Sequence, residues 1–235
     1  MARIVSQTGQ AVLPLDTGWR LTVTPAGACA TPEDASGLFD WIPAHAPGTT
    51  ADALRRAGAA PVALGSVDVW WRRGLEGEGR RILSFDGLAG LAEVWLDGEL
   101  VLTSRSMFLA HEVEVDLTGR HDLWLAFRAM DPELERKAPR ARWRPRMIPR
   151  QGLRTVRTTL MGRMPGWTPS VETVGPWRPI RVLSPTPVEL IRVDVRSGWT
   201  GGRGWISAEV ELDGASLPPV LCCNGVRVAL QPRAE

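Results

Sequence analysis

Short segments in which apolar and polar residues alternate are the feature of this 235-residue chain that most restricts its fold. The segment AHEVEVDLT at 110–118 places three apolar residues on one side of a strand and three acidic residues on the other. The segment DLWLAFRAM at 122–130 alternates in the same way. A period of two residues is typical of strands that bury one face. These two segments therefore predict neighbouring β-strands.

Similar signs recur along most of the chain. Further strands are predicted at 19–25, 67–75, 80–88, 91–103, 177–184, 188–197 and 204–214, and the segment at 91–103 forms a hairpin around Asp97-Gly98. The stretch ADALRRAG at 51–58 favours a short helix, with Thr49 and Thr50 as possible N-caps and Gly58 as a stop signal. Trp70 and Trp71 are adjacent, so they face opposite sides of a strand, and at least one is expected to be buried. Many short strands separated by turns predict an all-β sandwich, with the jelly roll as the natural candidate.

Two prolines in SPTPVEL at 184–190 mark a domain boundary. We therefore predict a first domain at 1–184 and a second at 185–235. The second is too short for a complete two-sheet sandwich, which takes about seven strands and roughly 100 residues. We expect it to be the start of a sandwich whose remainder is missing.

The composition favours a globular protein, at 44% hydrophobic and 23% charged residues. The three cysteines, Cys29, Cys222 and Cys223, form neither a disulfide framework nor a zinc-binding spacing, so we expect buried or partly buried free thiols, no metal and no cofactor. The sequence has no signal peptide and no apolar stretch of about 18 residues. We expect a cytoplasmic protein without a membrane span.

One segment concentrates positive charge in a chain whose formal net charge is +2. Arginine recurs through 140–167 together with two Trp, and no acidic residue occurs from Arg136 to Val171. Arginine beside aromatic residues is one pattern of nucleic-acid binding. However, Lys137 is the sole lysine of the chain, so arginine abundance by itself is weak evidence for phosphate binding.

An ordered series of motifs carries a family resemblance. The motifs are HAPGTTADALRRAG, VDVWWRRGL, LSFDGLAGLAEVWLDGELVLTSRSMF and GPWRPIRVLS. Together they resemble the N-terminal sugar-binding domain of glycoside hydrolase family 2, in its β-mannosidase branch, over roughly 16–184. The resemblance implies a galactose-binding-like jelly-roll β-sandwich, an immunoglobulin-like β-sandwich and then a (β/α)₈ barrel with two catalytic glutamates. The last 50 or so residues fit an incomplete immunoglobulin-like sandwich.

The resemblance implies that this chain alone is inactive, because it contains no barrel. We expect the non-catalytic N-terminal region of a β-mannosidase-like enzyme that hydrolyses O-glycosidic bonds, with no catalytic residue of its own. Asp86 and Asp97 occupy turns, where such side chains usually bond local backbone. Glu172 ends the acid-free segment, and pairing with an arginine is expected there rather than catalysis.

The resemblance also implies which residues meet carbohydrate. The family's sugar-facing loops correspond to Ser106-Met107-Phe108 and to Gly166-Trp167-Thr168-Pro169, and we expect substrate contacts from Trp167, Thr168, Ser106 and Arg163. Ser106 stands where the family has Asn and Thr168 where it has Asp, so mannose specificity is not implied. Trp167 has an alternative role as a packing residue in the core or at an interface.

The arginines of the long segment have several possible partners. We expect Arg142, Arg144, Arg150 and Arg154 to meet carboxylates of the barrel domain, with acidic groups of the substrate as an alternative. Two other functions stay open at this point. One is a stand-alone carbohydrate-binding module, and the other is a nucleic-acid-binding protein that uses the segment at 136–163.

Overall fold

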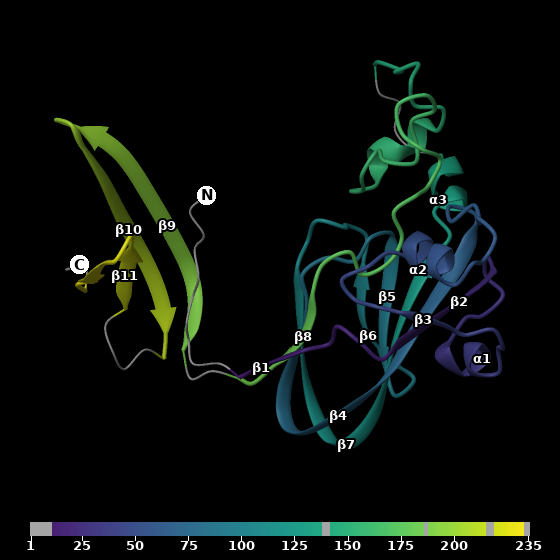
Figure 1. Cartoon of the computed structure of the whole chain (residues 1–235), viewed down its shortest axis with the longest axis horizontal. Helices are drawn as coiled ribbons and strands as arrows, with labels where there is room; N and C mark the ends of the chain where they lie inside the picture. The colour runs from purple at the N-terminus through teal and green to yellow at the C-terminus, as the bar shows by residue number, and fades with distance from the viewer. Residues whose placement is uncertain (1–10, 138–141, 186–187, 215–218, 233–235) are drawn as a thin grey trace. The chain divides into compact units, whose positions relative to one another are not determined.

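The computed structural model describes residues 11–137, 142–185, 188–214 and 219–232 (Figure 1). No helix in these ranges is long and apolar enough to cross a membrane. The contacts within the chain separate a larger unit, which ends at Ser184, from a smaller unit, which begins at Pro185. The two units are described one after the other.

The larger unit contains one sheet and a few short helices. Its strands are β1 Val12–Pro14, β2 Trp19–Pro25, β3 Ile42–Ala44, β4 Val67–Phe85, β5 Leu91–Leu96, β6 Glu99–Ser104, β7 His111–Arg128 and β8 Ile180–Leu183. Its helices are α1 Pro32–Ser36, α2 Thr50–Arg56, α3 Asp131–Glu135 and the 3₁₀-helix η1 Gln151–Thr155. The main order of the strands is β1-β8-β4-β7-β5-β6, and β2 pairs with β3 and β4.

The long strands β4 and β7 connect the two layers of the sandwich. They pair with each other from Val69–Phe127 to Phe85–His111. The first part of β4 also pairs with β2, whereas its last four residues pair with β8. Figure 1 shows β4 and β7 curving together where this change of partner takes place. A strand that changes partners along its length carries the chain from one layer of a sandwich to the other.

Tryptophans fill the interior on both sides of the sheet. Trp71 is fully buried in the main core, where its ring makes edge contacts with Trp19 and Phe127. Trp70 is also fully buried, but on the other face, where it packs against Trp124 in a second cluster that includes Cys29 and Ala35. The expectation that at least one of Trp70 and Trp71 is buried is confirmed. Both are buried because the segment around α1 covers the outer face of this part of the sheet.

The smaller unit consists of two hairpins in its described residues. One pairs β9 Glu189–Thr200 with β10 Arg203–Asp213, and the other pairs β11 Val220–Cys223 with β12 Val226–Ala229. None of the described residues from 188 onward is buried. Each hairpin therefore lacks a core of its own within the described part of the chain.

The all-β sandwich class is confirmed, and most predicted strands occur where the alternation placed them. The predicted helix is α2, which has Thr49 as its N-cap and ends before Gly58. Two predictions are wrong in detail, because 67–75 and 80–88 form the single strand β4, and 110–118 and 122–130 form the single strand β7. The helices α1 and α3 and the short strands β1 and β3 were not predicted. Each has only three to five residues, which is too few for a period to emerge.

Candidate functional site

The loop after β6 and the segment after η1 meet at one end of the larger unit. Met107 is buried between them. Its backbone N–H donates to the carbonyl of Arg157 at 3.0 Å, and its carbonyl accepts a hydrogen bond from the indole of Trp177 at 2.7 Å. The backbone N–H of Thr159 approaches the Met107 sulfur at 3.0 Å. The loop at 106–108 is thus fixed to the segment after η1 and to Trp177.

Ser106 lies at this junction, in a bridge with Arg157. Its hydroxyl accepts a hydrogen bond from the backbone N–H of Phe108 at 3.4 Å, and its carbonyl accepts one from the Ser104 hydroxyl at 3.2 Å. Phe108 is about half exposed and stacks edge-on against Trp177. The Ser106 side chain therefore bonds within its own loop, and in the described residues no hydrogen bond joins it to Trp167.

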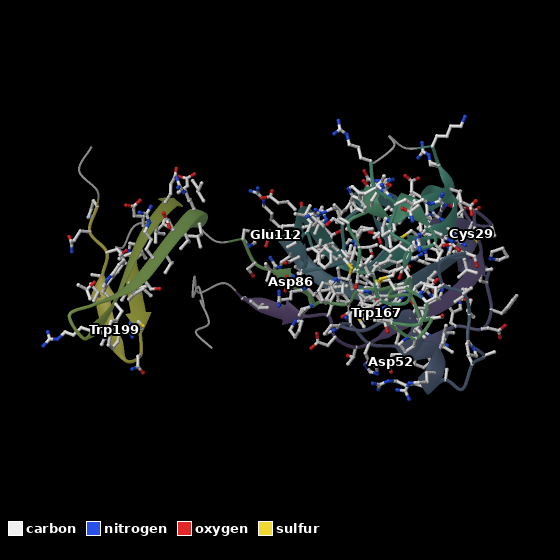
Figure 2. The ribbon with its side chains drawn as sticks, turned by 90° about the horizontal axis from the view of Figure 1, so that it is seen from above. Cys29, Asp52, Asp86, Glu112, Trp167 and Trp199 are labelled. Carbon is white, nitrogen blue, oxygen red and sulfur yellow. The ribbon has the colours of Figure 1, made fainter. Side chains whose placement is uncertain are left out.

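Trp167 projects from a tight turn. The residue is 73% exposed, so it is not a core residue of this chain. Figure 2 labels its position in the larger unit. The turn is held by the hydroxyl of Thr168, which accepts a hydrogen bond from the backbone N–H of Gly162 at 3.0 Å. The backbone N–H groups of Trp167 and Thr168 both point to the carbonyl of Met164. Thr168 thus supports the turn, and Trp167 offers a free ring face of the kind that stacks on a pyranose.

Arg163 lies behind this turn and is almost fully enclosed. Its side chain is 9% exposed, and one guanidinium nitrogen lies 3.5 Å from a carboxylate oxygen of Asp131 in α3. Arg150 also reaches Asp131, at 2.8 Å. These groups line a cavity of about 150 Å³ together with Glu172. The structure therefore brings Arg163, Thr168 and Trp167 into one turn, whereas Ser106 belongs to the adjoining loop.

The helix α3 supplies carboxylates to the arginine-rich segment, which is a correction to the sequence analysis. Besides Asp131, Glu133 pairs with Arg105 at 2.5 Å and with Arg136 at 2.9 Å. Hydrogen bonds from these two guanidinium groups hold the pKa of Glu133 below its ordinary value. The positive charge of the segment is thus partly balanced inside the same unit. Arg150 therefore already has a carboxylate partner within this chain, and its expected contact with the barrel domain stays a prediction.

The first part of the segment forms a braced, exposed loop. The guanidinium of Arg154 lies 4.8 Å from the ring centre of Trp143 and donates to the Trp143 carbonyl at 3.2 Å. Trp143 is 64% exposed. Arg142 and Arg144 are exposed on either side of it, and within the described residues neither has a carboxylate partner. Arg154 braces the loop, whereas Arg142 and Arg144 offer unpaired charge.

The other carboxylates considered in the sequence have structural partners. Asp86 pairs with Arg181 at 2.8 Å, and Asp97 accepts hydrogen bonds from His121 at 2.6 Å and from the backbone N–H of Asp122 at 2.8 Å. Burial raises the pKa of Asp97, but these two hydrogen bonds outweigh it, so the pKa lies below its ordinary value. Both side chains therefore bond residues far away in the sequence, and the expectation of local turn bonding is wrong.

Glu172 differs from these groups, because within the described residues it makes neither an ion pair nor a hydrogen bond through its side chain. It is half-buried at the wall of the cavity, near Arg150 and Arg163. The expected pairing with an arginine is therefore absent. Among the described residues, no group of His, Cys, Asp and Glu is placed to hold a metal ion.

The cysteines are free thiols. Cys29 is buried in the second cluster, and burial raises the pKa of its thiol. Cys222 and Cys223 are exposed in β11, so the expectation of burial is wrong for these two.

Sequence reasoning missed Asp131, the residue that brings Arg150 and Arg163 together. The stretch DPELE at 131–135 precedes the acid-free segment directly, and its three acidic residues were the available signal. A proline at the second position and acidic residues in the first turn favour a helix start at this place. The pairing with arginines up to 32 positions away depends on the path of the loop, which no local pattern indicates.

Comparison with known proteins agrees with this fold. Residues 66–178 match the model of the family described as the glycosyl hydrolase 2 galactose-binding domain-like family. A 70-residue stretch is 41% identical to β-mannosidase B of Emericella nidulans, and the match covers 26% of this chain and 8% of the relative.

Solved structures share the fold at low sequence identity. A β-D-mannosidase of Dictyoglomus thermophilum superposes with a TM-score of 0.65 at 18% identity, over 88% of this chain and 27% of that protein. A β-glucuronidase of Ruminococcus gnavus gives a TM-score of 0.57 at 12% identity, over 92% of this chain and 35% of that protein. The chain thus spans about a third or less of these proteins. Residues 66–178 thus match the galactose-binding-like domain of glycoside hydrolase family 2, and the fold is similar to that of a β-D-mannosidase.

Proposed function

We propose that this chain acts as the non-catalytic N-terminal region of a β-mannosidase-like glycoside hydrolase, where it supports a catalytic barrel and shapes its sugar pocket. The observation that carries the proposal is the exposed Trp167, held on a hydrogen-bonded turn within a region that matches the family model. An aromatic ring that is 73% exposed leaves apolar area in water, and a pyranose face is a suitable cover for it.

The reaction belongs to the larger polypeptide in this proposal. Retaining glycosidases use two carboxylates about 5–5.5 Å apart, one as nucleophile and one as acid and base. In this chain Asp86, Asp97 and Asp131 are engaged by Arg181, His121 and Arg150. Carboxylates that are engaged in this way serve the fold and are not free to act on a glycosidic bond. The chain alone should therefore not hydrolyse glycosides.

The experiment uses the longest natural polypeptide that contains this chain. Replacing Trp167 with Ala should lower kcat/KM by roughly tenfold, which corresponds to about 1.4 kcal/mol of binding to the transition state. Trp143→Ala is the matched control, because Trp143 is a similarly exposed Trp of the same segment that lies outside the turn. An equal loss in both variants, or none in Trp167→Ala, would rule out the proposed contact.

The substrate panel should include more than one sugar, because similar folds carry different specificities. The solved relatives include a β-D-mannosidase, a β-glucuronidase and a β-galacturonidase. The 4-nitrophenyl β-glycosides of mannose, glucuronic acid and galacturonic acid thus form the minimal panel. We place the polypeptide in the cytoplasm, as the sequence predicts.

Two alternatives have their own tests. Strong retention of the isolated chain on a polysaccharide column would favour a stand-alone carbohydrate-binding module. The exposed Arg142, Trp143 and Arg144 are the observation that favours a nucleic-acid-binding protein. Such binding must weaken steeply as salt rises, so a gel shift with single-stranded DNA at several salt concentrations decides that case.

A further inference from the structure

The cavity behind Trp167 is assembled from three separate segments of one unit. The helix α3, the region of η1 and the turn at 162–165 each contribute to its wall. Its floor is apolar and consists of Leu134, Ile148 and Leu153, of which Leu134 and Leu153 are buried. A volume of about 150 Å³ exceeds the space of a single water molecule several times. The cavity is thus a place where a small polar molecule can bind.

Arg163 brings unused hydrogen-bond donors to this cavity. Its side chain is 9% exposed, yet the contact with Asp131 at 3.5 Å is the one hydrogen bond that its guanidinium makes within the described residues. A guanidinium carries five N–H donors. Each side-chain nitrogen of Arg163 either makes a hydrogen bond or retains some contact with solvent. Its free donors therefore open toward the cavity that it lines.

Glu172 brings unused acceptors to the same cavity. It is half-buried at the wall, and its carboxylate has no partner among the described residues. Asp131 adds oxygen atoms that are already shared between Arg150 and Arg163. Arg163 and Glu172 thus line one partly open cavity, and no ion pair or hydrogen bond joins them in the described residues.

The charges that line the cavity favour a neutral ligand. Two guanidinium groups, Arg150 and Arg163, are matched by the carboxylates of Asp131 and Glu172, with Glu135 at 3.8 Å from Arg150 as a third. An anion that binds Arg163 would enter a cavity that the carboxylate of Glu172 also lines, and a cation that binds Glu172 would enter a cavity that Arg163 lines. A neutral molecule with adjacent hydroxyls meets neither problem, because each hydroxyl both donates and accepts.

We propose that this cavity binds two neighbouring hydroxyl groups of a neutral saccharide, with Arg163 as the donor and Glu172 as the acceptor. The apolar floor then meets the C–H groups of the sugar ring. The inference goes beyond the proposed function, since the cavity is formed by this chain alone and needs no catalytic domain. The saccharide in this cavity would be a second sugar unit, distinct from the sugar ring that stacks on Trp167.

The test is an NMR titration of the 235-residue chain, observed at the arginine Nε–H signals. The methyl glycosides of mannose, glucose and galactose are the probes, and tetrahydropyran-2-methanol is the ring compound without a diol. We expect at least one glycoside to shift the Arg163 signal with a Kd on the order of 1–10 mM, as befits a small ligand with few contacts. Glu172→Gln should weaken this binding by roughly tenfold, because it removes a charged acceptor.

Matched variants distinguish binding in the cavity from binding elsewhere on the surface. Glu112→Gln and Arg142→Met change exposed groups outside the cavity and should leave the Kd unchanged. Arg163→Met should abolish binding, and the isosteric Glu172→Gln keeps the test valid if loss of Arg163 unfolds the turn. Urea unfolding of each variant, followed by tryptophan fluorescence, identifies such a loss.

Several outcomes would overturn the inference. The inference fails if no glycoside shifts the Arg163 signal, or if tetrahydropyran-2-methanol binds with the same Kd as the glycosides. It also fails if methyl glucuronoside or inorganic phosphate binds more tightly than the neutral glycosides. Tighter binding of phosphate than of neutral glycosides, together with a further gain in phosphate binding in Glu172→Gln, would identify an anion site instead. Failure of this titration leaves the role of Trp167 in catalysis untouched, because that role is measured by kcat/KM in the larger polypeptide.

Discussion

Arg128, at the end of β7, joins several segments through one guanidinium group. It donates to Glu93 at 2.7 Å, to Asp68 at 3.1 Å and to the carbonyls of Cys29 and Ala30 at 2.7 Å each, and it lies over the ring of Trp70. Asp68 is almost completely buried. Arg128→Met should lower the free energy of unfolding by about 3 kcal/mol, because it leaves the buried Asp68 without its countercharge. Urea denaturation followed by tryptophan fluorescence measures this loss.

A surface ion pair provides the control for this prediction. Arg80 pairs with Glu114 between two exposed side chains of β4 and β7. Arg80→Met should lower the free energy of unfolding far less than Arg128→Met, because exposed pairs contribute little. If Arg128→Met costs no more than Arg80→Met, the network around Asp68 does not stabilise the fold as described.

His111 makes stability depend on pH. It is half-buried and its ring lies 2.9 Å from the Ser104 hydroxyl, and burial lowers its pKa in the folded chain. The unfolded chain, with an ordinary pKa of about 6.5, binds this proton more readily. Stability should therefore fall as the pH drops from about 7 through 6.5 toward the lowered folded pKa. Unfolding of His111→Gln at several pH values should show a weaker decline, while His45→Gln, which changes an exposed histidine, should retain the decline of the parent chain.

At the scale of the element, the sequence predicts a strand well where turn residues bound it. The strand β2 begins and ends as its flanking Gly18 and Pro25 indicate. The same logic fails for β4, in which Gly77 and Gly79 have the appearance of a turn. In the structure, Gly77 pairs with Gly119 across the β4–β7 ladder, and Leu117 fills the space above it. Gly77 thus makes room for the buried Leu117, and a local pattern does not distinguish this use from a turn.

The contact between η1 and α3 depends on Gly152. A Cβ atom at this position would lie 2.0 Å from the carbonyl oxygen of Leu134, which belongs to the backbone and has little freedom to move. Gly152→Ala should therefore separate the two elements and cost about 1–3 kcal/mol. It should also speed amide exchange around the cavity, because Leu134 and Leu153 form part of its floor. The control is Gly37→Ala, where no atom lies within 4 Å of the added Cβ, and an equal effect of both changes would contradict the assigned packing.

For the molecule as a whole, the sequence indicates where charge is placed but not how it is balanced. The arginine-rich segment has the appearance of an unpaired basic patch because its carboxylates lie outside it. The structure divides the segment into two groups. Arg136, Arg150 and Arg163 meet α3, whereas Arg142 and Arg144 keep their charge toward solvent in the described residues. Long-range loop closure produces this division, so sequence reasoning found the site segment but not the pairing that builds its cavity.

The two units of the chain should also differ in stability, because their burial differs. The strands β4 and β7 line cores on both faces, whereas Val193, Val195 and Trp199 of β9 are exposed on an apolar face whose cross-strand neighbours on β10 are Val210 and Ala208. Two-stranded sheets without a core are marginally stable in water. Amide exchange followed by mass spectrometry should therefore be at least roughly a hundredfold faster at 189–213 than at 67–85. Equal protection of the two regions would mean that the apolar face of β9 and β10 is covered in solution, and the exchange would then depend on protein concentration if a second copy provides the cover.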